Sequence, residues 1–344
     1  MPTIKINLTE QQVKHLCNNG EIVITLGGAA DRQPPATSAV TGAQQTSFFD
    51  FIQRRADQLA KAGSQRTAET YRTVLNQFRR FRDNEDLPLS AVSVELMEQY
   101  QAYLRSRNLT MNTVSFQMRI LRSVYHHGVH IGLVADGLPF RNVYTGSAKT
   151  QKRALTLEQM QHIRNLTLTE PLQVFARDMF ILSFYLRGMS FVDMAYLRHS
   201  DLHDGQIAYK RRKTGQLLSI RWERQMAEIV DRYSSERRPT PYLLPIISKA
   251  NGKERNQYRH IQTLVNKGLK EVGRQAGIAM PLTMYCARHT WATMARDMQV
   301  PMSVISRGMG HSNERTTEIY LRSVDVSCVD EANERIMKLV KGEE

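Results

Sequence analysis

The sequence predicts a mainly helical protein with a small β-sheet, arranged as two folded domains. A chain of 344 residues is long enough for about two domains of ordinary size. Apolar residues recur at helical spacing through residues 47–138 and through most of residues 154–344. β-type runs in the second of these segments are short, at 206–209 and 217–222, and a Lys213-Thr214-Gly215 turn joins them.

Composition favours a reduced, soluble protein with a polyanionic partner. The formal charge is +14 and the pI is about 9.8, which indicates nucleic acid first, with a basic protein lacking such a partner as the alternative. Cys17, Cys286 and Cys328 are odd in number and far apart, so neither a disulfide framework nor a metal site is expected. The start lacks a signal-peptide pattern, and the longest apolar run is too short to span a bilayer. A cytoplasmic location follows as the expectation.

Residues 1–46 form a short N-terminal unit and linker. Ile4, Ile6 and Leu8 alternate with polar residues as in a strand, and Glu21–Leu26 is a second β-type run. Gly27 to Thr46 contains glycine, proline and small residues, as is typical of a linker. The unit is either an accessory DNA-binding arm or a packed extension.

Residues 47–138 are expected to form a helical domain with basic outer faces. Helices are predicted from Ser47, after Thr67, over about 94–106 and from Met111. Arginines on the polar faces are candidates for phosphate contacts, although such faces are often merely solvated: Arg72, Arg79, Arg119 and Arg122. Residues 139–153 are predicted to be a basic interdomain linker.

The second domain, 154–344, begins with a helix that Thr156 and Gln159 cap in a capping-box pattern. Further helices are expected over 175–186, 190–197, 223–233, 258–276, 283–295, 301–308, 313–321 and 329–340. The last of these is amphipathic; it packs either on its own domain or, as in the family that the chain resembles below, on a neighbouring copy of the chain.

An ordered set of polar residues carries the expected chemistry: Arg187, Lys213, Arg288, His311 and Tyr320. Each of them alone has an ordinary structural explanation, such as a helix cap, a hairpin turn or a core tyrosine. Together they supply cations for phosphorane oxygens, a further hydrogen-bond donor and a phenolic nucleophile. Such a set can break a phosphodiester without a metal ion or cofactor.

The same residues resemble the tyrosine recombinase (phage integrase) family. Thr283–Ala295 resembles its H-x-x-R-H helix, Gly308–Ser312 its L-G-H-S turn, and Thr316–Tyr320 its T-T-x-x-Y segment. The resemblance covers about residues 47–340 and implies a helical core-binding domain followed by an α+β catalytic domain.

The resemblance implies a role for each matching residue. Tyr320 attacks the phosphorus, Arg187 and Arg288 bind the non-bridging oxygens with His311, and Lys213 is the general acid. Asp193 orients an arginine from behind. The basic residues of the hairpin, Lys210, Arg211 and Arg212, are expected to contact DNA.

This sequence departs from the family pattern at two positions. Ser190 stands three residues before Asp193, where the family has its first arginine, so Arg187 or, failing that, Arg198 must substitute. Tyr285 stands where the family has a histidine, and its hydroxyl is expected to donate to a phosphate oxygen.

The expected function is site-specific recombination of double-stranded DNA through a 3′-phosphotyrosine, with integration, inversion or excision as the outcome. The resemblance implies a homotetramer on two sites, and an accessory DNA-bending protein is a further candidate partner. The alternatives are a type IB topoisomerase-like nicking-closing enzyme and an inactive DNA-binding regulator.

Overall fold

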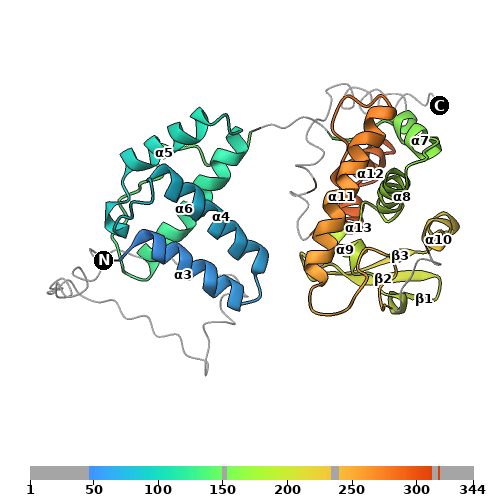
Figure 1. Ribbon diagram of the computed structural model, residues 1–344, viewed down its shortest axis with the longest axis horizontal. Coiled ribbons are helices and arrows are strands. Elements are labelled where there is room, and N and C mark those ends of the chain that lie inside the picture. Colours follow the sequence, from blue (N-terminus) through green and yellow to red (C-terminus); the bar gives the residue numbers. More distant parts are fainter. Residues whose placement is uncertain (1–45, 149–152, 234–239, 312–316, 318–344) are drawn as a thin grey trace, which may run out of the picture. The chain divides into compact units, whose positions relative to one another are not determined.

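The computed structural model describes residues 46–148, 153–233, 240–311 and 317 (Figure 1). Its internal contacts divide the chain into two compact units, Met1–Thr150 and Gln151–Glu344. The predicted elements of residues 1–45 lie outside the described residues, and so does the predicted helix 329–340. The structure is mostly helical with one small sheet in the second unit, which confirms the predicted fold class.

The first unit contains four α-helices in its described part: α3 (Phe48–Lys61), α4 (Gln65–Phe81), α5 (Val94–Ser106) and α6 (Met111–His130). The hydroxyls of Ser47, Ser93 and Thr110 accept backbone N–H groups at the starts of α3, α5 and α6. A short 3-10 turn, η1 (Leu89–Ala91), lies between α4 and α5.

Aromatic side chains form the centre of this unit. Phe48, Phe78 and Tyr100 are fully buried, and the rings of Phe78 and Tyr100 meet edge to face at 4.9 Å. Phe140 and Val143 also join this core, so residues 139–148, predicted as the start of a linker, pack on the first unit.

In the second unit the helices gather together, and a three-stranded sheet lies at one end of them (Figure 1). The helices are α7 (Leu157–Asn165), α8 (Pro171–Tyr185), α9 (Phe191–Ala195), α10 (Arg224–Asp231), α11 (Glu254–Gln275), α12 (Met284–Asp297) and α13 (Met302–Gly308), with a 3-10 turn η2 (His199–Asp201). The capping box predicted at Thr156 and Gln159 is present.

The sheet is antiparallel in the order β1 (Leu202–His203), β2 (Gln206–Lys210), β3 (Leu217–Arg221). Ile207 pairs with Ile220 and Tyr209 with Leu218, and these four side chains are buried on one face. The hairpin predicted at residues 206–222 is therefore confirmed, whereas the two-residue β1 was not predicted.

Candidate active site

Arg288 is the buried cation at the centre of the site. It lies on α12 and is only 6% exposed. Its Nη1 donates to the Gly188 carbonyl at 2.8 Å, and its Nη2 donates to the Met309 carbonyl at 2.6 Å. Nη2 also lies 2.9 Å from His311 Nε2. Because these contacts come from the turn after α8 and from the end of α13, one side chain brings three parts of the unit together.

Gly188 allows the turn after α8 to lie directly on α12. Its φ is +70°, a conformation that side chains with a Cβ seldom adopt. A Cβ at this position would lie 2.7 Å from the Arg288 Cα, well inside van der Waals contact. The close approach is what lets the Gly188 carbonyl accept from the Arg288 guanidinium.

His311 is neutral at pH 7 and has a defined tautomer. Burial, reinforced by the charges of Arg288, Arg211 and Lys213, lowers the pKa of His311 to about 4. An arginine can only donate, so Nε2 of the ring accepts from Arg288. Nδ1 therefore carries the proton and donates to the buried Thr317 hydroxyl at 2.7 Å.

Lys213 sits at the exposed turn of the β2–β3 hairpin. The turn is closed by the Arg211 N–H, which donates to the Gln216 carbonyl at 2.8 Å, and by the Gly215 N–H, which donates to the Arg211 carbonyl at 2.7 Å. The positive charge of Lys213 contributes to the lowered pKa of His311, so its ammonium is within electrostatic reach of the ring.

Arg211 differs from its neighbours on the hairpin because it points into the domain. It is 7% exposed, and its Nη1 donates to the Gly310 carbonyl. Its guanidinium therefore does not extend outward from the hairpin, and a contact of Arg211 with DNA would have to be made inside the site. Lys210 and Arg212 are exposed, and the Arg212 guanidinium lies over the Tyr196 ring, 3.7 Å from its centre.

Asp193 supports the hairpin through its backbone. One carboxylate oxygen accepts from the Ser190 hydroxyl at 2.7 Å, and the other accepts from the Arg212 N–H at 2.9 Å. The arginine that the carboxylate contacts here is therefore Arg212, through its main chain. Asp193 is 3% exposed, so this carboxylate is a fixed anchor between α9 and the hairpin.

Arg187 extends from the end of α8 toward β3. Its backbone has a φ of +56°, and its Nη1 lies 3.4 Å from the Ser219 carbonyl, a long hydrogen bond. Arg198, the other predicted substitute, is exposed, and its N–H donates to the Asp201 carboxylate at 2.8 Å.

Tyr285 lies one helical turn before Arg288 on α12 and is 44% exposed. Its ring packs edge to face on His289 with centres 4.5 Å apart. Burial, followed by the charges of Arg153 and Arg288, lowers the pKa of His289 to about 4. A second neutral imidazole therefore accompanies Tyr285 on this face of α12.

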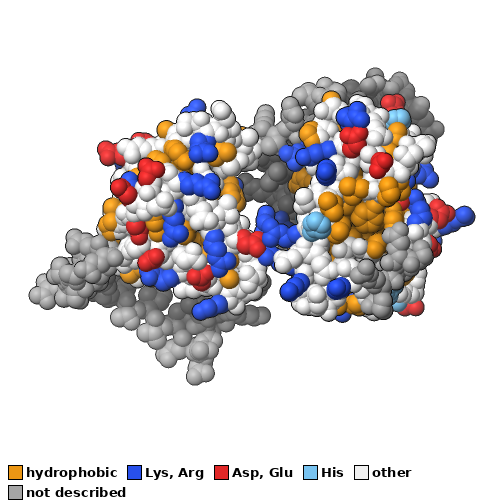
Figure 2. Space-filling model, viewed as in Figure 1, with side chains coloured by type: hydrophobic (Ala, Val, Ile, Leu, Met, Phe, Trp, Pro, Cys, Tyr) orange, Lys and Arg blue, Asp and Glu red, His pale blue; other side chains and the backbone are white. Residues whose placement is uncertain are grey.

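The arginines predicted to contact DNA in the first unit have different surroundings. Arg72 pairs with Asp57 at 2.6 Å, Arg79 lies over the Phe49 ring at 5.3 Å, and Arg122 donates to the Thr145 hydroxyl at 3.2 Å. Arg119 is exposed on α6. The face of the first unit that Figure 2 shows carries interspersed basic and acidic side chains.

An apolar groove adjoins the site where α12, α13 and β3 meet. Trp291, Val304 and Leu217 line it, and Leu217 is 73% exposed. Arg187 and Arg307 border the groove.

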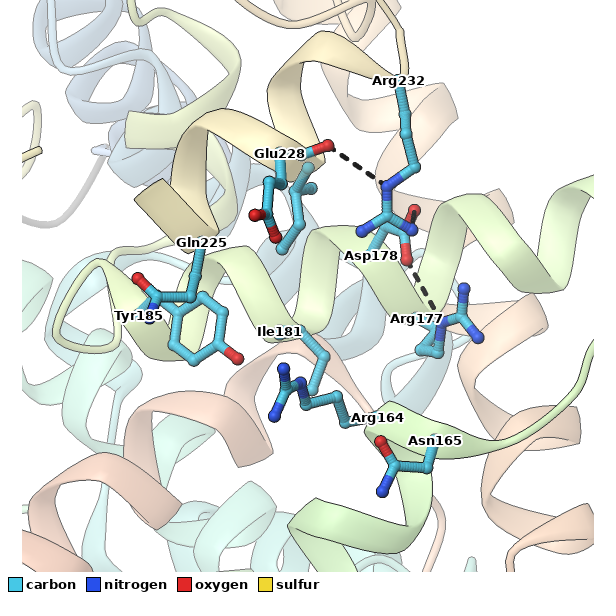
Figure 3. A pocket seen from close by; sticks show the side chains of 10 residues that line it. Arg164, Asn165, Arg177, Asp178, Ile181, Tyr185, Gln225, Glu228 and Arg232 are labelled. Atoms are coloured by element: carbon cyan, nitrogen blue, oxygen red, sulfur yellow. Dashed lines mark hydrogen bonds and ion pairs between the residues drawn. The ribbon is translucent and has the colours of Figure 1, made fainter. Parts of the chain in front are cut away.

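A separate polar pocket lies between α7, α8 and α10 (Figure 3). Asp178 is 2% exposed there and pairs with Arg177 at 3.1 Å and with Arg232 at 2.9 Å. The Tyr233 hydroxyl donates to the same carboxylate at 2.8 Å. Because the described residues lining this pocket include none of the predicted catalytic residues, we read the network as structural.

Tyr320 lies outside the described residues, so the site described here is the one around Arg288 and His311. Sequence reasoning missed the burial of Arg211 and the contact of Thr317 with His311. A run of basic residues in a hairpin gives no indication that one of them is buried. The threonines of the T-T-x-x-Y segment, in contrast, were a signal in the sequence that could have indicated a contact with His311. Within the described ranges, no His, Cys, Asp and Glu side chains gather where they could bind a metal ion. None of the described helices is long and apolar enough to cross a membrane.

Comparison with known protein families gives two matches. Residues 47–141 match the phage integrase SAM-like domain, and residues 153–326 match the phage integrase family. The tyrosine recombinase XerD of Listeria innocua is 23% identical over 233 residues, covering 64% of this chain and 75% of that protein. The tyrosine recombinase XerA of Pyrococcus furiosus is 24% identical over 250 residues, covering 71% and 82%.

Solved structures share the fold at low identity. A lambda integrase dimer bound to a COC′ core site superposes with a TM-score of 0.64 and 15% identity, covering 81% of this chain and 98% of that chain. A lambda integrase tetramer bound to a Holliday junction gives 0.62 and 15%, covering 84% and 81%. The Tn1549 transposon integrase in complex with circular intermediate DNA gives 0.61 and 14%, covering 85% of this chain and 99% of that chain.

Proposed function

The chain belongs to the phage integrase family, and we propose on that premise that it is a tyrosine site-specific recombinase that cuts and rejoins double-stranded DNA through a 3′-phosphotyrosine at Tyr320. The observation that carries the proposal is the buried Arg288 held 2.9 Å from His311, beside a hairpin that presents Lys213. This is a preorganised binding site for a phosphate that gains charge during the reaction.

Arg288 binds a non-bridging oxygen of the scissile phosphate in the proposed mechanism. Its guanidinium has five N–H donors in a fixed plane, and its backbone partners hold that plane in place before DNA arrives. Two carbonyls, those of Gly188 and Met309, supply the described anchoring contacts. Little reorganisation is then required in the transition state.

The covalent step exchanges one phosphate ester for another. The Tyr320 oxygen forms a bond to phosphorus, and the bond from phosphorus to the 5′ oxygen breaks, with its electron pair leaving on that oxygen. The leaving oxygen takes a proton from the Lys213 ammonium, and the phenolic proton of Tyr320 passes to solvent. The reverse sequence, with a 5′ hydroxyl from a partner strand, rejoins DNA without a further energy source.

His311 changes its hydrogen bonding when phosphate binds. In the free protein its Nε2 accepts from Arg288, so this nitrogen has no proton to donate to a phosphate oxygen. The negative charge of a bound phosphate opposes the burial and the nearby cations that hold the His311 pKa at about 4. We therefore propose that DNA binding protonates His311 and makes it a donor to the phosphate.

Two residues are candidates for the role of the family's first arginine, which binds the scissile phosphate. Arg187, predicted from the sequence, lies at the end of α8, and Arg211 lies on the hairpin. Tyr285, which is 44% exposed, remains the proposed donor at the position of the family histidine.

Duplex DNA is the proposed partner of both units. We propose that exposed Lys210 and Arg212 contact the phosphate backbone beside the site, and that exposed Arg119 contacts DNA on the first unit. Neighbouring side chains contact Arg72, Arg79 and Arg122. We propose that these contacts hold the three guanidinium groups in place, and that their charge attracts the DNA backbone.

A homotetramer on two sites is the proposed active assembly. Support comes from the fold shared with an integrase that was solved as a tetramer on a Holliday junction. An accessory DNA-bending protein and a cytoplasmic location, on DNA, complete the proposal.

Long-read sequencing of DNA from expressing cells tests this function. Wild-type protein is expected to produce new inversion, excision or integration junctions, and Tyr320→Phe none. Tyr258→Phe is a matched control, because it removes a hydroxyl with no described hydrogen bond and keeps the ring that contacts Tyr196. Relaxation of supercoiled plasmid without any junction would favour a nicking-closing enzyme, and junctions from Tyr320→Phe would refute the assigned nucleophile.

A further inference from the structure

The site lacks the first arginine of the family pattern, and the residue in its place cannot substitute for it. The Ser190 hydroxyl is a helix cap for α9: it accepts from the Asp193 N–H at 3.4 Å and donates to the Asp193 carboxylate at 2.7 Å. A neutral hydroxyl committed to that carboxylate supplies no positive charge to a phosphate. A second guanidinium must therefore come from elsewhere in the unit.

We propose that Arg211, on the β2–β3 hairpin, is the second phosphate-binding arginine of the site, a catalytic residue in the sense that its guanidinium contacts the non-bridging oxygens. This inference rests on the proposed function, because it assigns a ligand of the same scissile phosphate. Neither the family pattern nor the motif around Arg187 points to this residue.

Arg211 and Arg288 are held in the same way. Arg288 is 6% exposed and donates to the Met309 carbonyl, while Arg211 is 7% exposed and donates to the carbonyl of the next residue, Gly310. The following residue is His311. Two buried guanidinium groups thus donate hydrogen bonds to consecutive carbonyls of the turn that carries the proposed catalytic histidine.

Arg211 retains the donors that a phosphate requires. A guanidinium has five N–H groups, and the one described side-chain hydrogen bond of Arg211 uses Nη1. No carboxylate in the described part of the chain forms an ion pair with it. Burying a cation without a counter-ion is costly, so an anion bound here would be stabilised strongly.

The electrostatic surroundings distinguish Arg211 from Arg187. The charges that lower the pKa of His311, after burial, are those of Arg288, Arg211 and Lys213, and Arg187 is not among them. Arg211 also has a larger effect than Arg187 on the buried Tyr209 hydroxyl. Burial raises the pKa of this hydroxyl, and the charge of Arg211 opposes that rise more than the charge of Arg187 does. The charge of Arg211 therefore acts on both groups more strongly than the charge of Arg187 does.

Arg187 is engaged on the other side of the hairpin. Its Nη1 reaches the Ser219 carbonyl on β3, and its side chain borders the groove formed with Trp291. Its stem also passes close to Gly308 on α13. These contacts make Arg187 a positioning residue that braces α8, β3 and α13.

Gly310 makes the Arg211 contact sterically feasible. Its φ is +65°, and a Cβ there would lie 2.7 Å from Leu218 Cδ1 and 3.1 Å from Arg211 Cδ. The hairpin and the His311 turn are packed this closely only because residue 310 has no side chain. Arg211 also stands two residues before the proposed general acid, Lys213, on the same hairpin.

A neutral substrate tests which arginine binds the phosphate. The DNA is a duplex carrying the crossover sequence read from the recombination junctions, made either with its normal scissile phosphodiester or with a methylphosphonate, in which a methyl group replaces one charged non-bridging oxygen. The proteins are full-length wild type, Arg211→Met, Arg187→Met and an exposed control on α10, Arg224→Met. The measured quantity is the rate of covalent protein–DNA adduct formation.

Arg211→Met is expected to slow adduct formation on the phosphodiester by about a hundredfold or more, as for loss of a preorganised donor. On the methylphosphonate its rate should come within about threefold of wild type, because the charge that Arg211 neutralises is gone. Arg187→Met should lose the same factor on both substrates, and Arg224→Met should lose nothing on either.

Equal losses for Arg211→Met on both substrates would overturn the inference, as would selective rescue of Arg187→Met. If Arg211→Met does not fold, judged by tryptophan fluorescence, Arg211→Gln replaces it. Glutamine removes the charge but keeps N–H donors, and its selective rescue or equal loss on the two substrates decides in the same way. Wild type that forms no adduct with either duplex would refute the proposed function itself, which is a separate outcome.

Discussion

Replacing Gly188 with alanine is expected to disrupt the contact between the turn after α8 and α12. The new Cβ would lie 2.7 Å from the Arg288 Cα, a backbone atom that cannot rotate away. Gly205→Ala is a matched control: Gly205 has a φ of +68°, against +70° for Gly188, and a Cβ there meets nothing within 4 Å.

The two substitutions share one energetic effect and differ in another. A left-handed conformation costs an L-residue about 1–2 kcal/mol, and the loss of unfolded-state freedom on replacing glycine returns about 0.4–1 kcal/mol. Gly205→Ala should therefore cost about 1 kcal/mol. Overpacking adds about 1–3 kcal/mol at Gly188, so Gly188→Ala should lower the free energy of unfolding by about 3 kcal/mol.

Urea unfolding followed by tryptophan fluorescence measures the unfolding free energy of the second unit, which contains Gly188 and Gly205. Both tryptophans, Trp222 and Trp291, lie in that unit. Adduct formation by Gly188→Ala should fall by about a hundredfold, since a shift of about 1 Å in a catalytic group has that effect. If Gly188→Ala and Gly205→Ala were equally stable and equally active, the close packing of Gly188 on Arg288 would be refuted.

Three further predictions concern the surroundings of the site. Thr317→Val removes the acceptor of His311 Nδ1 and should slow adduct formation by about tenfold, whereas Thr317→Ser should retain most of the rate. The pKa values of His289 and His311 are lowered from 6.5 to about 4, so the unfolded chain binds more protons than the folded protein between pH 6.5 and 4. The free energy of unfolding should therefore fall as the pH drops from 6.5 to 4. Urea titrations at several pH values should show a smaller fall for His289→Gln than for wild type. Asp178→Leu leaves two arginines without their buried partner and should cost about 3–5 kcal/mol of unfolding free energy, compared with under about 1 kcal/mol for Glu158→Leu at an exposed position of α7. Equal costs at both positions would contradict the network.

Local signals in the sequence account for most of the fold. The helix predicted over 94–106 is α5, because Ser93 caps its start and an apolar stripe faces the core. The hairpin was predictable because its strands alternate and its turn is Lys-Thr-Gly. In each case the information lies within a few residues of the element that it specifies.

The positions of individual site residues depend on contacts that a local pattern does not contain. Arg211 belongs to the basic run Lys210–Lys213, which looks like an exposed face, yet it donates to a carbonyl 99 residues away. Asp193 was expected behind an arginine side chain, and its described arginine contact is the backbone of Arg212. The pairing of Arg288 with His311 was implied only through the family resemblance, because no spacing rule brings residues 23 apart together.

Mapping of covalent adducts in cells tests the central claim most directly. Cells expressing wild type or Tyr320→Phe are lysed in denaturant, protein-linked DNA is captured, and the attached 3′ ends are sequenced. The account predicts adducts at defined sites for wild type only, with the phosphate on Tyr320 and a free 5′ hydroxyl across the break. Adducts that persist in Tyr320→Phe, or a wild type that recombines DNA without ever forming one, would contradict it.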